Sequence, residues 1–172
     1  MLAILLATLM AFAVQTKAPA PASATNQLAA IFVYNGAWTV TSPGTMAGPG
    51  KPDHLVNTCR LTGSFYACEQ VVNGKTMALV LFVAADKPDH FYTQPILPDG
   101  HAIGRGDLVI VHEAKGDHWT FTSKNVEADK TIRYRTENYF SGVDKIHFEQ
   151  FESADGVKWE MKNSGDEQHG NS

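Results

Sequence analysis

The chain has no excess of basic residues and no catalytic signature. Its 172 residues hold 14 Lys and Arg against 18 Asp and Glu, a formal net charge of −4. A nucleic-acid-binding surface is usually basic, so we expect no nucleic-acid partner. The sequence has no Gly-x-Ser-x-Gly elbow, no phosphate-binding loop and no His-Glu-x-x-His motif. It therefore identifies no catalytic residue.

Long apolar runs are also lacking, apart from one at the start. Residues 2–14 are nearly all apolar, which is the length of the hydrophobic region of a secretory signal. Small-residue cleavage sites follow, among them Ala22-Ser23-Ala24. We expect residues 1–24 to be a signal peptide, with the cleavage position open, and the protein to be exported to the periplasm or the extracellular space. An uncut membrane anchor is the alternative; after cleavage no membrane span is expected.

Cysteine is scarce, with Cys59 and Cys68 alone. An even count in an exported chain indicates a disulfide, and two buried thiols are the alternative. Only His54 lies close enough in sequence to join them as a ligand. We therefore expect no metal site and no cofactor.

Helical periodicity is absent after residue 32, and alternation of apolar and polar residues recurs instead. Residues 28–32 are compatible with a short helix. The strands are expected at residues 34–40, 54–60, 65–72, 76–84, 90–96, 107–113, 118–123, 130–139, 145–152 and 157–162, with a weaker one at 101–104. Residues 163–172 are polar without periodicity, so we expect a disordered tail after a domain at 25–162.

Regular spacing and tight turns predict sequential antiparallel strands. Asn73-Gly74 and Asp155-Gly156 are strong hairpin signals. A long meander must close or cover its edges, because open strand edges promote aggregation. The fold class is therefore all-β, an antiparallel up-and-down barrel of about eight to ten strands. A two-sheet sandwich is the alternative.

The strand at residues 34–40 is the one that organises the barrel. Gly36 and Trp38 are two positions apart, so both face the same side of that strand. Glycine leaves room there and the indole fills it. We expect Trp38 to plug one end of the barrel.

These residues resemble a known family. Gly36-Ala37-Trp38 resembles the Gly-x-Trp of lipocalins and other calycins, and the later pattern is similar to uncharacterised bacterial lipocalin-like secreted proteins. The matching segments are Cys68-Glu69-Gln70, Asn73-Gly74-Lys75, Gly116-Asp117-His118-Trp119-Thr120-Phe121, residues 130–135 and residues 153–159. The resemblance implies an up-and-down barrel with an apolar interior. It also implies a basic residue of the last strand covering the first-strand Trp, for which Lys158 and Lys162 are the candidates.

Candidate ligand-binding side chains are aromatic residues of the strands and two basic ones. They are Trp38, Tyr66, Tyr92, Arg135 and His147. If Arg135 and His147 point inward, they would hold a carboxylate head group, because guanidinium geometry matches two oxygens. The alternative places Arg133 and Arg135 on the surface, paired with Glu149 across strands. The alternation does not decide between these faces.

The sequence therefore predicts a non-catalytic barrel that binds a small hydrophobic or amphipathic ligand in its interior. One alternative is a barrel enzyme (isomerase, cyclase or hydrolase type) with an interior set drawn from His147, Arg135 and Glu137. Another is an envelope scaffold with no ligand. The oligomeric state is left open.

Overall fold

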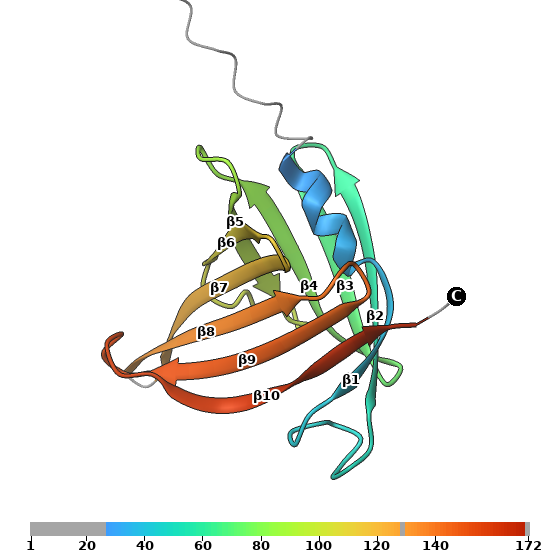
Figure 1. Ribbon diagram of the computed structural model, residues 1–172. Coiled ribbons are helices and arrows are strands. Elements are labelled where there is room, and N and C mark those ends of the chain that lie inside the picture. Colours follow the sequence, from blue (N-terminus) through green and yellow to red (C-terminus); the bar gives the residue numbers. More distant parts are fainter. Residues whose placement is uncertain (1–26, 128–129, 171–172) are drawn as a thin grey trace, which may run out of the picture.

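The chain forms a closed ten-stranded antiparallel barrel (Figure 1). The computed structural model describes residues 27–127 and 130–170. The strands are β1 Gly36–Thr41, β2 Asp53–Thr62, β3 Phe65–Val72, β4 Lys75–Ala84, β5 His90–Ile96, β6 Gly106–Glu113, β7 Gly116–Glu127, β8 Lys130–Phe140, β9 Lys145–Ser153 and β10 Glu160–His169. A short 3₁₀ helix, η1 (Ala29–Tyr34), precedes them.

Each strand pairs with the next along the chain, and β10 pairs with β1 to close the barrel. The predicted all-β up-and-down barrel and its short N-terminal helix are confirmed, and the sandwich alternative is wrong. The alternating burial of β9, in which Ile146 and Phe148 are buried and His147 is exposed, is what a strand with one inward face requires.

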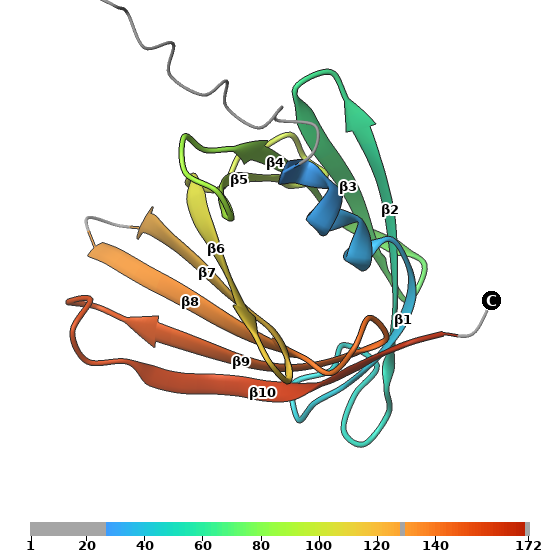
Figure 2. The ribbon, with the colours of Figure 1, turned by 45° about the horizontal axis from the view of Figure 1, so that its top comes forward.

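One end of the barrel is filled by η1. Figure 2 shows this helix lying within the ring of strands. Leu28 and Ile31 are at most 1% exposed, and they join Trp38 in one apolar cluster. The remaining buried members of the cluster are Cys59, Tyr66, Cys68, Phe82, Phe91, Leu108, Ile110, Trp119, Phe140 and Ile146. We call this the η1 end and the opposite one the loop end.

The predicted disordered tail is wrong for residues 163–169, which belong to β10. This strand pairs with β9 on one side and β1 on the other, so its backbone hydrogen bonds hold it in place. β10 lacks the alternation of apolar and polar residues by which strands are predicted, because Gly165 and Glu167 occupy its inward positions. A bulge between Met161 and Asn163 also shifts the register.

The turn between β9 and β10 is longer than the predicted hairpin. Asp155 accepts hydrogen bonds from the backbone N–H groups of Val157 and Lys158, at 2.8 and 2.9 Å, and from the Ser153 hydroxyl. Because of this local network, β10 begins at Glu160 and not at residue 157, where the sequence predicts the start of a strand. The weaker strand expected at residues 101–104 reduces to one bridge, between Ile96 and Ala102.

A buried carboxylate fixes the β1–β2 loop at the loop end. Asp53 accepts hydrogen bonds from the backbone N–H groups of Met46 and Ala47 and from the Asn73 side chain, each at 2.7 Å. Burial opposes ionisation of Asp53, but these donors outweigh it and hold the pKa of its carboxyl below the usual value. The loop is thereby tied to both β2 and the β3–β4 hairpin.

The predicted disulfide between Cys59 and Cys68 is confirmed. The two residues are direct cross-strand partners in the β2–β3 register, and both are buried. In the described part of the chain, no helix is long and apolar enough to cross a bilayer.

Removing the disulfide should lower the free energy of unfolding by about 2–3 kcal/mol, the loop-entropy value for so short a crosslinked segment. The change is the double substitution Cys59→Ala and Cys68→Ala, measured by urea unfolding followed by far-UV circular dichroism. The native protein under reducing conditions is the control and should lose a comparable amount. Unchanged stability in both would contradict the expectation.

Candidate functional site

The barrel interior holds a cavity between the apolar cluster of the η1 end and the loop end. It has two compartments of about 270 Å³ each. Both compartments are lined by Leu55, Gln70, Thr136, Asn138 and Glu167. The first also touches Tyr34 of η1, and the second reaches Met46 of the β1–β2 loop. The first compartment has a mainly apolar lining with a few polar groups, which is typical of a small-molecule site, and the second is more polar.

Glu167 of β10 lies where the compartments meet. Its cross-strand partners are Val40 of β1 and Ile146 of β9. Cross-strand partners point to the same face of the sheet, and Ile146 is buried inside the barrel, so the Glu167 side chain also faces inward. Within the described residues its carboxylate makes no hydrogen bond or ion pair. Burial therefore raises the pKa of Glu167 to about 7. The cavity contains an acid that changes charge near neutral pH.

Polar neighbours of Glu167 come from three other elements. Asn138 of β8 donates a hydrogen bond to the Tyr34 hydroxyl at 2.7 Å. Burial, and then the negative charge of Glu167, raise the pKa of Tyr34 well above its usual value, so this phenol stays neutral. Asn57 of β2 is only 3% exposed, and its Oδ1 has no hydrogen-bond partner in the structure. The inner wall thus carries buried polar capacity that the described protein atoms do not satisfy.

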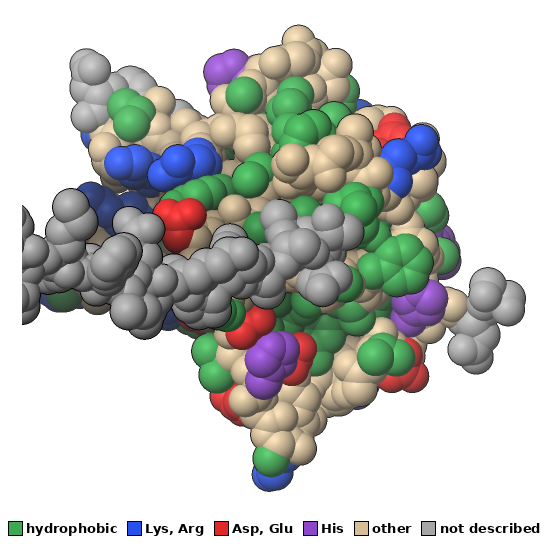
Figure 3. All heavy atoms as spheres, turned by 90° about the horizontal axis from the view of Figure 1, so that it is seen from above, with side chains coloured by type: hydrophobic (Ala, Val, Ile, Leu, Met, Phe, Trp, Pro, Cys, Tyr) green, Lys and Arg blue, Asp and Glu red, His purple; other side chains and the backbone are tan. Residues whose placement is uncertain are grey.

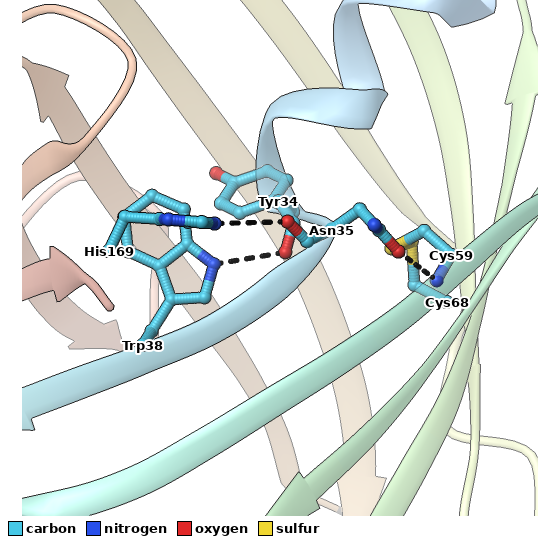
Figure 4. Close-up of a disulfide and its surroundings, with 6 residues drawn as sticks. All are labelled: Tyr34, Asn35, Trp38, Cys59, Cys68 and His169. Carbon is cyan, nitrogen blue, oxygen red and sulfur yellow. Dashed lines mark hydrogen bonds between the residues drawn. A yellow bond between two sulfur atoms is a disulfide. The ribbon is translucent and has the colours of Figure 1, made fainter. Parts of the chain in front are cut away.

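Trp38 packs in the apolar cluster of the η1 end, and Figure 4 shows its indole beside His169 and Tyr34. Its indole N–H donates to the Tyr34 carbonyl at 3.0 Å, and its ring meets the His169 imidazole edge-on, with 4.7 Å between centroids. A Cβ on Gly36 would lie 2.6 Å from His169 Nε2, so the glycine leaves room for this imidazole. The space at Gly36 is therefore filled by the His169 imidazole, which packs against the indole, and not by the indole itself as the sequence predicts.

The residue covering Trp38 is not one of the expected lysines. Lys162 is exposed and bonds Glu160 at 2.7 Å, and Lys158 lies in the exposed β9–β10 turn. The basic side chain that packs edge-on against the indole is His169, which lies where the sequence predicts a disordered tail. Once residues 163–169 continue the barrel as β10, the end of the last strand reaches Trp38.

The predicted ligand-binding residues do not line either compartment. Trp38 and Tyr66 face inward but are packed in the apolar cluster. The Tyr66 hydroxyl is buried without a hydrogen-bond partner, and burial raises the pKa of this phenol. These two rings are therefore part of the apolar core next to the cavity and do not line it.

The other three predicted ligand-binding residues lie on the outer face of the barrel. Arg105 covers the Tyr92 ring at 4.4 Å, and His147 Nδ1 lies 3.1 Å from Asp166. The Arg135 guanidinium carbon lies 4.5 Å from the centre of the Trp159 ring.

The inward-facing anion clamp of Arg135 and His147 is therefore wrong. Arg135 is a surface residue, as in the alternative, but its Nε pairs with Glu137 at 3.0 Å instead of Glu149. The inward face of β8 is the one that carries Tyr134, Thr136 and Asn138, because these residues line the cavity.

The outer wall also holds a histidine–carboxylate pair. His118 Nε2 lies 2.8 Å from Glu137 Oε2, which also accepts from the Thr120 hydroxyl at 2.6 Å. An enzyme of the kind considered above needs such a pair in the pocket. Here the carboxylate is already bonded by its strand neighbours and faces away from the cavity. In residues 27–127 and 130–170 no cluster of three or more His, Cys, Asp or Glu is arranged to hold a metal ion.

No Lys, Arg or His is found among the described residues that line the two compartments. Figure 3, which looks onto the η1 end, shows hydrophobic side chains around the middle of this face and Lys and Arg side chains toward its edges. The ionisable side chains facing the cavity are the acids Asp53 and Glu167 and the phenols of Tyr34 and Tyr134.

Sequence reasoning missed the polar residues of the cavity. Asn57 could have been found from its position: Leu55, Asn57 and Cys59 share one face of β2, and a single amide between two apolar residues on a strand face is unusual. Asn138 stands in a similar position two residues before Phe140. Glu167 had no such signal, because its strand carries few apolar residues.

No protein-family model matches the chain, and no curated protein matches it. Among solved structures, the chain is similar to Rv2717c from M. tuberculosis, with a TM-score of 0.57 and 11% sequence identity. The similarity covers 84% of this chain and 98% of that chain. At this level of identity it shows a shared barrel fold and carries no information on activity.

Proposed function

We propose that the protein is an exported, lipocalin-like barrel that binds a small hydrophobic or amphipathic molecule in its interior without transforming it. The observation that carries this proposal is the interior cavity, whose compartments of about 270 Å³ are bounded by the plugged η1 end. A barrel of this size can enclose one small ligand.

Two further features support the proposal. The Gly36–Trp38 pair with His169 over the indole fits the lipocalin-like resemblance, in which a basic residue covers the first-strand Trp. The Cys59–Cys68 disulfide is compatible with an oxidising compartment outside the cytosol. The histidines and arginines required by the enzyme alternative lie outside the cavity lining described above.

Binding of 1-octanol, a small neutral amphiphile, tests the proposal. We expect saturable binding, with the largest backbone amide shifts in nuclear magnetic resonance spectra on residues next to Thr136 and Leu55. The substitution Thr136→Trp should weaken binding about tenfold or more, because the indole would occupy the space where the compartments meet.

The matched control is Thr58→Trp, which adds the same side chain at an exposed position on the outside of β2. It should bind 1-octanol like the native protein. Far-UV circular dichroism verifies that both variants keep the barrel. Absence of saturable binding to the native protein, or equal weakening in both variants, would rule against an interior site.

A further inference from the structure

The interior of the barrel is acidic. Asp53 and Glu167 are the charged side chains that line the two compartments, and they come from opposite neighbours of β1. Asp53 is already satisfied by its three donors from Met46, Ala47 and Asn73. Among residues 27–127 and 130–170 no group donates a hydrogen bond to Glu167, so its carboxylate is left in the cavity without a partner.

The two kinds of polar group differ in what they demand of a ligand. The amides of Asn57 and Gln70 can turn either oxygen or nitrogen to a partner, while Asn138 uses its nitrogen for the Tyr34 hydroxyl and offers its oxygen. An ionised carboxylate can only accept hydrogen bonds, and its burial is costly without a cation or several donors. The charge of Glu167 therefore determines which ligand head group the cavity accepts.

We propose that the cavity selects amphipathic amines, with the ammonium group paired to Glu167 and the apolar body against the surrounding wall. This inference rests on the proposed ligand-binding function and adds the chemical class of the ligand. It reverses the head group expected from sequence, because the basic residues thought to hold a carboxylate point outward.

The wall around Glu167 fits both parts of such a molecule. Leu55 borders both compartments, and Val80, Phe82 and Phe121 line the first. They supply apolar surface for a short hydrocarbon body. The unpartnered Oδ1 of Asn57, also in the first compartment, offers a second acceptor to a donor-rich head group. A carboxylate ligand would instead meet Glu167 as a like charge.

The test compares three ligands with the same chain: octylamine, 1-octanol and octanoate. Isothermal titration calorimetry at pH 8 should give affinity for octylamine about tenfold above that for 1-octanol, since a charge-assisted hydrogen bond replaces a neutral one. Octanoate should bind most weakly. At pH 5 the amine preference should shrink, because Glu167, with a pKa of about 7, is then protonated. The lowered pKa of Asp53 keeps this carboxyl ionised across the range, and the raised pKa of Tyr34 keeps that phenol neutral.

Two variants separate the head-group contact from the cavity itself. Glu167→Gln should bind 1-octanol normally and lose the preference for octylamine. Glu69→Gln, which removes an exposed carboxylate on the outside of β3, is the matched control and should retain the preference.

The outcomes distinguish the two proposals. If 1-octanol binds inside the barrel but octylamine binds no better, or octanoate binds best, the amine inference is overturned while the binding function stands. An amine preference that survives Glu167→Gln also overturns it. If none of the three ligands binds, the proposed function fails, and the inference fails with it.

Discussion

Replacing Trp38 by alanine should lower the free energy of unfolding by about 3–5 kcal/mol, the range for truncating a fully buried large aromatic side chain. Trp38 is 1% exposed, so the loss includes both its apolar burial and the void left behind. It also removes the hydrogen bond to the Tyr34 carbonyl, which ties η1 to β1. Urea unfolding followed by far-UV circular dichroism measures the change.

The matched control is Trp159→Ala. Trp159 is a half-buried indole on the outer wall, and its described contact is with the Arg135 guanidinium. We expect a loss of about 1 kcal/mol or less, since a partly exposed cation–π contact contributes little. Equal losses for the two tryptophans would show that the Trp38 plug does not hold the barrel together.

The fold could be predicted from sequence because strands and turns are determined by residues close together in the chain, through period-two alternation and turn-forming residues. The boundaries of β3 and β5 agree with the predicted strands at 65–72 and 90–96. Hairpin pairing then follows from chain order, and it places Cys59 opposite Cys68. Closure follows because a meander of this length leaves two edges to satisfy.

The site was not accessible, because both faces of β8 mix polar and apolar residues. Sequence favours Arg135 for ligand binding since arginine suits anions, yet its guanidinium lies over the Phe151 and Trp159 rings outside the barrel. The inward residues Thr136 and Asn138 are less conspicuous in sequence. Which face is inward depends on the whole set of strands, so one strand cannot reveal it.

β10 was missed for a related reason. Interior positions of a barrel are recognised as apolar, but a cavity allows polar residues such as Glu167 to face inward. Gly165 is also inward, and a Cβ there would lie 2.1 Å from the Thr41 carbonyl oxygen, so close backbone packing replaces a side chain. The strand that closes the barrel therefore lacks the hydrophobic pattern by which strands are recognised.

Glu167→Gln should stabilise the free protein at pH 8 by as much as about 3 kcal/mol and have little effect near pH 4. The pKa of Glu167 is raised by burial from 4.5 to about 7 in the folded state. A raised carboxyl pKa means that the folded state holds the proton more tightly than the unfolded state. The stability this provides is complete below pH 4.5 and is lost as the pH rises toward 7. Glutamine, which is nearly isosteric and neutral, avoids that loss.

The measurement is the difference in unfolding free energy between Glu167→Gln and the native protein, taken by urea denaturation at several values from pH 4 to pH 8. Using the difference cancels other titrating groups, including Asp53, whose lowered pKa gives stability above its unfolded pKa that is lost on acidification. Glu69→Gln should show a flat difference over the same range. A flat difference for Glu167→Gln as well would mean that water or an unrecognised donor solvates this carboxylate. The cavity would then lack the unsatisfied anion on which amine selection depends.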